Sequence, residues 1–372
     1  MNNSELSKVI DIMRLPLIFF VIIAHLVPFT LPVVHFPSNA NVLYTLISET
    51  FSHHLAKLSV RCYFLVSGYY FFNRYKDDLL AFLKRQFKSR FRTLLIPYVV
   101  WNVLTVIAVF FKNYTFNYLG MPLDDHVSIL EKGNLYNIFW GLPANFPLWY
   151  IRDLLCMIVL SPLIYFFIKY LKRYGIIILA VLYVGSFDTN VPGLSLTAIF
   201  FFSLGAYFSI EKKDILYVFN KIKSPAYLLM ICFLVLSLAN NGQQYQEYFL
   251  RIFILTGVVS IFNLFSYLSE RFAVMNLLQG FSSLSFFIYV VHEIYIINWL
   301  KGYFYGLTMY ENGGGKILIY FAIPFLCLAI CAGLYYLLLK IAPKLLVFSL
   351  GGRMPNYNNR ENDREKRIES HH

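Results

Sequence analysis

The sequence predicts an all-α fold, a polytopic bundle of about ten transmembrane helices with both chain termini in the cytoplasm. Composition is the first observation, because 58% of the 372 residues are hydrophobic and only 14% are charged. Soluble domains carry about a quarter charged residues. The second observation is that the hydrophobic residues form runs long enough to cross a bilayer. The third is that Lys and Arg gather on alternate connections between these runs.

The hydrophobic runs define the expected spans. A bilayer core needs about 20 residues of apolar helix, at a rise of about 1.5 Å per residue. The fifth and seventh runs are the shortest of the set. We expect spans at residues 12–33, 56–72, 93–111, 147–168, 175–188, 194–210, 225–239, 249–268, 280–300 and 316–340.

The distribution of Lys and Arg predicts the orientation, since positively charged connections stay in the cytoplasm. With the N-terminus inside, the inner segments hold 23 of the 32 basic residues and the outer segments hold six. An even number of spans returns the C-terminus to the same side. We therefore expect one transmembrane domain over residues 1–350 and a charged, disordered cytoplasmic tail over 351–372. The first span lacks the flanks of a cleaved signal peptide, so we expect it to remain as a helix.

Several function classes are disfavoured by composition. The net charge of +12 does not indicate nucleic-acid binding, because the basic residues alternate with hydrophobic spans and form no soluble basic face. The five cysteines lie in apolar stretches without a CxxC pair, so we predict neither a disulfide framework nor a metal site. Two long outer connections, residues 34–55 and 112–146, mix polar and aromatic residues and are candidates for a lid.

Two ionisable residues within the first span are costly in lipid and so suggest a function. Arg14 and His25 lie 11 residues apart, about three turns, and point to nearly the same helix face. Their axial separation of about 16.5 Å places Arg14 near the cytoplasmic boundary and His25 in the outer half of the bilayer. Asp11 precedes Arg14 by three residues, within reach of an ion pair. Snorkelling to the headgroups also explains Arg14, whereas an intramembrane His usually faces a cavity.

The arginine, ten residues and histidine of "RLPLIFFVIIAH" (14–25) resemble the signature of the acyltransferase-3 family of integral membrane acyltransferases. Four further stretches resemble that family and occur in its order. Their order and spacing across most of the chain carry the resemblance, since each short string is weak alone. They are "FLVSGYYF" (64–71), "KRQFKSRFRTLLIPYVVW" (84–101), "PLWYIRDL" (147–154) and "FFIYVVHE" (286–293).

The resemblance implies an enzyme of the bacterial cytoplasmic membrane. Such an enzyme moves an acyl group, commonly acetyl from acetyl-CoA, to a hydroxyl of a glycan, a lipid-linked glycan or another envelope component outside that membrane. In the family, the residues that match Arg14 and His25 are regarded as essential. His25 would deprotonate the attacking hydroxyl or carry the acyl group briefly itself. Arg14, oriented by Asp11, would hold the donor or stabilise negative charge near the thioester.

We expect the basic segment after the second span to bind the phosphates of the donor, since Arg binds phosphate bidentately and Lys binds it as a point charge. Ordinary positive-inside charge also explains most of these residues. Family members often carry two arginines three residues apart here, and this chain departs from that pattern, so the individual contacts stay open. The candidates are Arg85, Lys88, Arg90 and Arg92, with Ser67 near the thioester arm.

Candidate acceptor-binding residues lie near the expected outer ends of the spans. Trp149 is equally explained as an interfacial anchor, whereas the adjacent charges of Arg152 and Asp153 are costlier inside a span. The remaining candidates are Glu49 and His53, one helical turn apart, and His292, which is followed by Glu293.

A transporter or flippase for a glycan or small metabolite is the alternative function, with the intramembrane charges lining a permeation path. Transporters often show inverted repeats and paired broken helices, and neither is visible in the sequence. A sensor that binds a lipid or glycan without chemistry is a third class, without a positive feature to support it. Cleavage of a thioester distinguishes an acyltransferase from a transporter and from a sensor.

Overall fold

The part of the chain that the structure describes is entirely helical. The computed structural model describes residues 3–28, 32–34, 37–73, 75, 78–121 and 134–353, and these ranges contain no β-strand. The all-α prediction is therefore confirmed. Most of the predicted tail, 351–372, and parts of both candidate lid connections lie outside the described residues.

The helices follow one another with short connections. The first half of the chain contains α1 (Asn3–Ala24), α2 (Ala40–Ser48), η1 (Glu49–Leu55), α3 (Ala56–Phe72), α4 (Leu79–Arg90), η2 (Phe91–Leu95), α5 (Ile96–Tyr118), η3 (Asn137–Gly141), η4 (Phe146–Leu148), α7 (Trp149–Val159) and α8 (Ser161–Val184). The second half contains α9 (Leu196–Ile210), α10 (Ile215–Lys221), α11 (Lys223–Ala239), α12 (Gln246–Arg271), η5 (Ala273–Leu278), α13 (Ser282–Val291), η6 (His292–Ile296), α14 (Ile297–Tyr305), η7 (Thr308–Glu311), α15 (Gly313–Ile341) and α16 (Pro343–Ser349).

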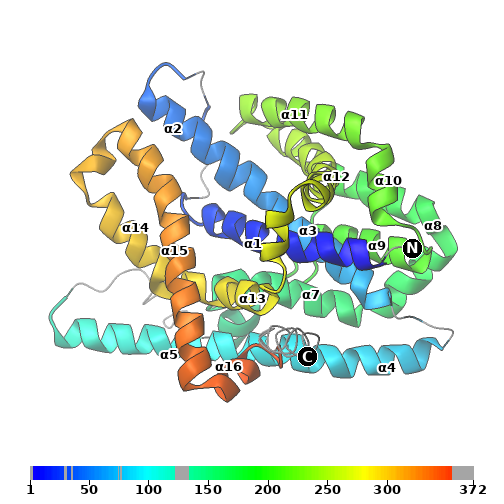
Figure 1. Ribbon diagram of the computed structural model, residues 1–372, viewed down its shortest axis with the longest axis horizontal. Helices are drawn as coiled ribbons and strands as arrows, with labels where there is room; N and C mark the ends of the chain where they lie inside the picture. Colours follow the sequence, from blue (N-terminus) through cyan, green and yellow to red (C-terminus); the bar gives the residue numbers. More distant parts are fainter. Residues whose placement is uncertain are drawn as a thin grey trace, which may run out of the picture.

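Helix α1 lies at the centre of the bundle. Figure 1 shows it surrounded by later helices, with the continuous α4–α5 rod along one side. Its contacts come from α3, α12, α13, α15 and η1, and among residues 4–24 only Ser4 is exposed. The helix that carries Arg14 is therefore largely covered by other helices, although helices such as α15 are more apolar.

Helices α3 and α9 approach each other so closely that only glycine fits at positions 68 and 205. A Cβ atom added to Gly68 would lie 2.0 Å from the carbonyl oxygen of Phe202, and one added to Gly205 would lie 1.9 Å from that of Leu65. Small residues allow this approach between helices in membranes. Gly68 and Gly205 therefore allow the close packing of α3 on α9.

The length and hydropathy of the helices identify a multi-pass membrane protein. Within the described part of the chain, four helical segments could each cross a bilayer, at Leu79–Tyr118, Gln246–Arg271, Ser283–Tyr305 and Gly313–Ile341. Two bent pairs, α7 with α8 and α10 with α11, raise the number to six if each pair is one span. Large apolar side chains stay exposed on these helices, for example Phe110 and Phe111 of α5 and Phe325 of α15. Lipid tails would cover such a surface at no cost.

Two expected spans are interrupted. The segment expected at 147–168 breaks between α7 and α8 with a bend of 63°. Pro162, at the start of α8, explains this break, because proline lacks an N–H and disfavours helical geometry in the residue before it. The segment expected at 280–300 is broken at η6, where Tyr295 has a φ of 66°.

The close contact between α3 and α9 leads to a prediction about stability. Substitution of Gly205→Ala should destabilise the protein by about 1–3 kcal/mol, because the new methyl group forces the two backbones apart. The control is Gly333→Ala in α15, where an added Cβ meets no atom within 4 Å. Thermal unfolding of both variants in detergent, followed by intrinsic fluorescence, measures the difference. Equal melting temperatures for the two variants would contradict the prediction.

Candidate active site

One face of α1 lines a cavity within the bundle. Arg14, Ile18 and Val21 face this space, which we call the α1 cavity and which has a volume of about 220 Å³. The spacing of these residues, four and then three positions, is that of a single helix face. Arg14 Nη1 lies 2.7 Å from Oδ1 of Asp11, so the predicted ion pair is present.

The other walls of the α1 cavity come from distant segments. Ser67 of α3, Tyr150 of α7 and Tyr289 of α13 line it, and the hydroxyl groups of Ser67 and Tyr150 are 3.2 Å apart. Val21 precedes His25 by four residues, so the cavity reaches to within about 6 Å of the level of His25 along α1.

A larger groove adjoins the Arg14 end of the α1 cavity. This basic groove has a volume of about 760 Å³ and is lined by Arg85, Ser89 and other residues of α3 and α4. Tyr70 and Arg90 line both spaces, so the groove and the cavity meet at these two side chains.

Helix α1 ends inside the protein, directly before His25. The last carbonyl groups of a helix have no partner within it and need external donors when buried. Three side chains from two other elements, η1 and α14, meet this need. Ser52 Oγ lies 2.7 Å from the carbonyl oxygen of Ile23, Lys301 Nζ donates to that of His25 at 2.9 Å, and Tyr305 OH donates to that of Leu26 at 2.8 Å.

The break in the helix of α13 and α14 brings two further ionisable residues to His25. Non-helical backbone at Ile294 and Tyr295 directly follows His292 and Glu293. The rings of His25 and His292 lie 5.3 Å apart, and Glu293 Oε2 lies 3.7 Å from Nδ1 of His25. Strained or π-helical backbone of this kind is common at functional sites.

His292 is fully buried, and one of its ring nitrogen atoms has a fixed role as a hydrogen-bond donor. Its Nδ1 lies 3.0 Å from the carbonyl oxygen of Ile288, which places the proton on Nδ1. Nε2 then carries a lone pair, and among the described residues it has no hydrogen-bond partner. His25, His292 and Glu293 each offer one ligand atom, and these atoms lie within 4.8 Å of one another. A divalent cation could bridge such a group, and the absence of a metal stays a prediction.

Comparison with known protein families identifies the family to which this chain belongs. The model of an acyltransferase domain matches residues 8–337, which include α1, the basic segment and the broken helix. The chain belongs to the acyltransferase-3 family. The resemblance seen in the sequence motifs is therefore confirmed, and membership implies acyltransferase activity and an acyl donor.

One curated relative of this acyltransferase-3 protein matches over nearly its whole length. The succinoglycan biosynthesis protein ExoH of Rhizobium meliloti (strain 1021) is 25% identical over 363 residues, which cover 94% of each chain. No solved structure matches the chain significantly.

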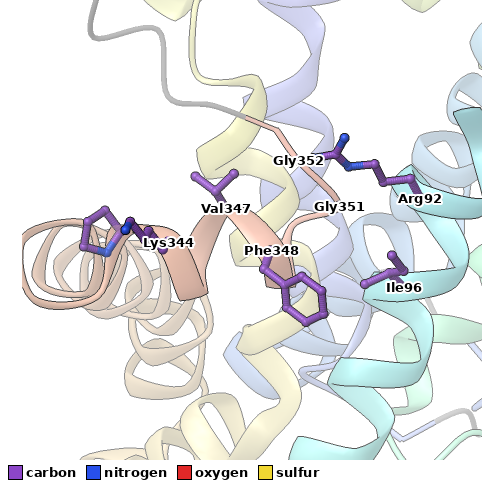
Figure 2. Close-up of a pocket in the computed structure, with 8 residues that line it drawn as sticks. Arg92, Ile96, Lys344, Val347, Phe348, Gly351 and Gly352 are labelled. Carbon is purple, nitrogen blue, oxygen red and sulfur yellow. The ribbon is translucent and has the colours of Figure 1, made fainter.

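The structure separates the predicted donor-binding residues of this acyltransferase-3 protein into two groups. Arg85, Arg90 and Ser67 line the basic groove or the α1 cavity. Lys88 is exposed on α4 and lines neither space. Arg92 lies at another cleft, lined also by Ile96, Lys344, Phe348 and their neighbours, as Figure 2 shows.

Two predicted acceptor-binding residues form a buried pair. Glu49 and His53 are 2% and 3% exposed, and both carboxylate oxygens of Glu49 lie 2.9 Å from Nδ1 of His53. Asn241 Nδ2 donates to the same carboxylate at 3.0 Å. The α1 cavity and the basic groove are lined by other residues, so contact with an acceptor stays a prediction for this pair.

Arg152 and Asp153 bind each other and neighbouring protein groups. Arg152 donates to Oδ1 of Asp153 and to the carbonyl oxygens of Trp140 and Gly141. Ser195 Oγ donates to the other carboxylate oxygen of Asp153 at 2.6 Å. These contacts tie η3 and the start of α9 to α7. Trp149 is half-buried and packs against the core, and acceptor binding by all three residues stays a prediction.

Two basic residues lie at the site although the sequence did not predict a role there for either. From the sequence, Lys301 is one of the six basic residues of the outer segments, and Arg353 belongs to the charged tail. Lys301 binds the carbonyl of His25, and Arg353 lines the α1 cavity. Helical periodicity links neither residue to α1, because each lies far from it along the chain.

The capping of α1 leads to a prediction about positioning. Substitution of Lys301→Met should lower the rate of acyl transfer by between about tenfold and a hundredfold, because the end of α1 and the ring of His25 lose a fixed position. Transfer by purified protein is the measurement, with the exposed Lys340→Met as the control. An unchanged rate in a folded Lys301→Met protein would show that this contact does not position His25.

Proposed function

We propose that this protein transfers an acyl group, preferably acetyl, from cytoplasmic acyl-CoA to a hydroxyl of an extracytoplasmic glycan or other envelope acceptor. The proposal rests on one observation above the others. A cavity along α1 connects the level of Arg14 with the last turn before His25, and it joins a larger basic groove at the Arg14 end. This arrangement offers separate places for the charged donor and for the acceptor hydroxyl.

The basic groove and the α1 cavity suit the two parts of acyl-CoA. The groove carries Arg85 and Arg90, which suit the negatively charged nucleotide end. The narrower cavity, with apolar Ile18 and Val21 and the hydroxyls of Ser67 and Tyr150, suits the pantetheine arm. The thioester would then lie toward His25.

His25 is suited to act as the general base in this reaction. Its Nδ1 faces the carboxylate of Glu293, so Nε2 is left to accept the proton of the acceptor hydroxyl. The hydroxyl oxygen attacks the thioester carbonyl, and the C–S bond breaks as the new C–O ester bond forms. The proton held by His25 then passes to the sulfur, so the products are the ester and CoA with a free thiol. Arg14, oriented by Asp11, would bind negative charge on the donor.

We propose about ten spans with both termini in the cytoplasm, forming one domain over residues 1–350. Length and hydropathy alone count four to six. That count leaves out α1, which carries several charged residues, and α3 and α9, which are shorter than 18 residues. All three helices nevertheless lie inside the bundle, where other helices cover them. The excess of Lys and Arg on one set of connections supports the orientation.

We place the protein in the bacterial cytoplasmic membrane. The similarity to ExoH, a succinoglycan biosynthesis protein, supports a glycan-related acceptor.

Release of CoA tests the proposed function against transport. Purified protein in detergent should cleave acetyl-CoA when a suitable glycan is present, with the free thiol followed by a chromogenic reagent. A transporter needs no thioester cleavage, so transport of a glycan without CoA release in reconstituted vesicles would overturn the proposal. Mass spectrometry of envelope glycans from cells with and without the protein would identify the acceptor.

Removal of the imidazole tests the role of His25. We expect His25→Ala to lower the rate by at least about a hundredfold, the usual contribution of a positioned general base. The melting temperature and membrane insertion should stay close to those of the original protein, because the contacts of the His25 ring within the described residues are packing against Phe146 and His292 and a 3.7 Å approach to Glu293. Full activity in this variant would refute the assignment.

Substitution of Glu293→Gln tests the partner of the imidazole. The amide keeps the shape of the side chain and removes its charge, so kcat should fall about tenfold or more while KM for the donor changes little. Steady-state kinetics at several donor concentrations separate the two constants. A rise in KM alone would instead indicate that Glu293 binds substrate and does not assist His25.

A further inference from the structure

Three guanidinium groups from distant parts of the chain meet at the wall of the α1 cavity. Arg14 comes from α1, Arg90 from the end of α4, and Arg353 from the segment that follows α16. Arg353 lies 16 residues beyond the last residue matched by the family model, which ends at 337. Neither the family match nor the sequence motifs therefore assign it a function.

A turn of two glycines directs Arg353 into the cavity. Gly351 and Gly352 have φ values of 69° and 83°, which favour glycine over residues with a side chain. Their N–H groups donate to the carbonyls of Phe348 and Val347, which closes the end of α16. A Cβ added to Gly351 would lie 2.8 Å from the carbonyl oxygen of Arg92, so the turn packs directly on η2 (Figure 2).

The guanidinium of Arg353 is held by neutral groups. Nη1 donates to the carbonyl oxygens of Thr93 at 2.9 Å and Leu350 at 2.7 Å. The guanidinium carbon lies 3.9 Å from the ring centroid of Phe286, a cation–π contact. No salt bridge joins Arg353 to a carboxylate within the described ranges. The side chain is thus fixed in place while its charge is not neutralised.

The local charge of this wall favours an anion. Asp11 pairs with Arg14, whereas no salt bridge within the described ranges joins Arg353 to a carboxylate. Burial, together with the neighbouring cations of Arg90 and Arg14, lowers the pKa of Arg353 to about 10. Bringing like charges together in a partly buried place costs free energy, and a bound polyanion would recover that cost.

We propose that Arg353 acts with Arg14 and Arg90 to bind the diphosphate of acyl-CoA where the basic groove meets the α1 cavity. This inference rests on the proposed function. The place is fixed by Arg90, which lines both spaces. A diphosphate held there leaves the nucleotide in the groove of about 760 Å³ and the pantetheine arm in the cavity of about 220 Å³. Planar guanidinium groups bind phosphate oxygens bidentately, so three of them suit two adjoining phosphates.

Binding of CoA fragments to the purified full-length protein tests this assignment. The variant is Arg353→Gln, and the control is Lys344→Gln, which removes one positive charge from the same C-terminal segment at the cleft of Figure 2. The probes are CoA, 3′-dephospho-CoA, which keeps the diphosphate, and pantetheine, which lacks all phosphate. Isothermal titration calorimetry in detergent measures each Kd.

We expect Arg353→Gln to raise the Kd of CoA and of 3′-dephospho-CoA by about ten- to a hundredfold, the effect of one lost charge-assisted contact. The Kd of pantetheine should not change, and Lys344→Gln should bind all three probes like the original protein. In acyl transfer, KM for the donor should rise while kcat stays within about twofold.

Other outcomes overturn the assignment in distinguishable ways. Equal CoA affinity in Arg353→Gln and the original protein would overturn this inference and leave the proposed function intact. A loss for CoA that 3′-dephospho-CoA does not share would place the contact at the 3′-phosphate and reject the diphosphate. No binding of CoA by the original protein would defeat the proposed function itself. If Arg353→Gln does not fold, Arg353→Lys keeps the charge without the planar fork, and its Kd for CoA should lie between those expected for Arg and Gln.

Discussion

The end of α1 inside the protein is the constraint on which the rest of the structure depends. A helix that stops in a buried place leaves carbonyl groups that water cannot reach, and each must find a donor. Ser52, Lys301 and Tyr305 supply these donors from η1 and α14. Because these elements must come close to satisfy the carbonyls, they bring the broken helix with His292 and Glu293 to the same place as His25.

The arrangement of helices follows the cost of exposing polar groups to lipid. The central helix α1 carries Glu5, Lys8, Asp11 and Arg14, whereas α15 is far more apolar and leaves Phe325 and other large side chains exposed. Apolar helices lose nothing by facing lipid tails, although the apolar α9 is buried by its close packing on α3. Helices with ionisable residues gain partners only inside the bundle. The close packing of α3 on α9 through Gly68 and Gly205 then holds this interior together.

Buried charged residues in this protein are of two kinds, and the difference helps to distinguish residues that stabilise the fold from residues that could bind a substrate. The polar atoms of the pair Arg152 and Asp153, and both carboxylate oxygens of Glu49 in its pair with His53, are occupied by protein partners. Such pairs resemble ordinary structural ion pairs, in which geometry offsets desolvation. The guanidinium of Arg353 at the α1 cavity is bound by neutral groups instead, and Nε2 of His292 has no hydrogen-bond partner among the described residues. Groups left in this state are the ones that an anion or a substrate could satisfy.

The sequence by itself determined the helical fold class and the family, because helical periodicity, hydropathy and short motifs are local properties of the chain. It also determined the ion pair of Asp11 with Arg14, which are three residues apart. Only the tertiary structure decided which basic residues reach the cavity: Arg85 and Arg90 line the two spaces, while Lys88 and Arg92 point elsewhere. It alone brought Lys301 and Arg353 to α1 from far along the chain. The physical reason is that a shared cavity depends on helix crossings, on the break at Tyr295 and on the glycine turn after α16, and no local pattern encodes how distant segments pack.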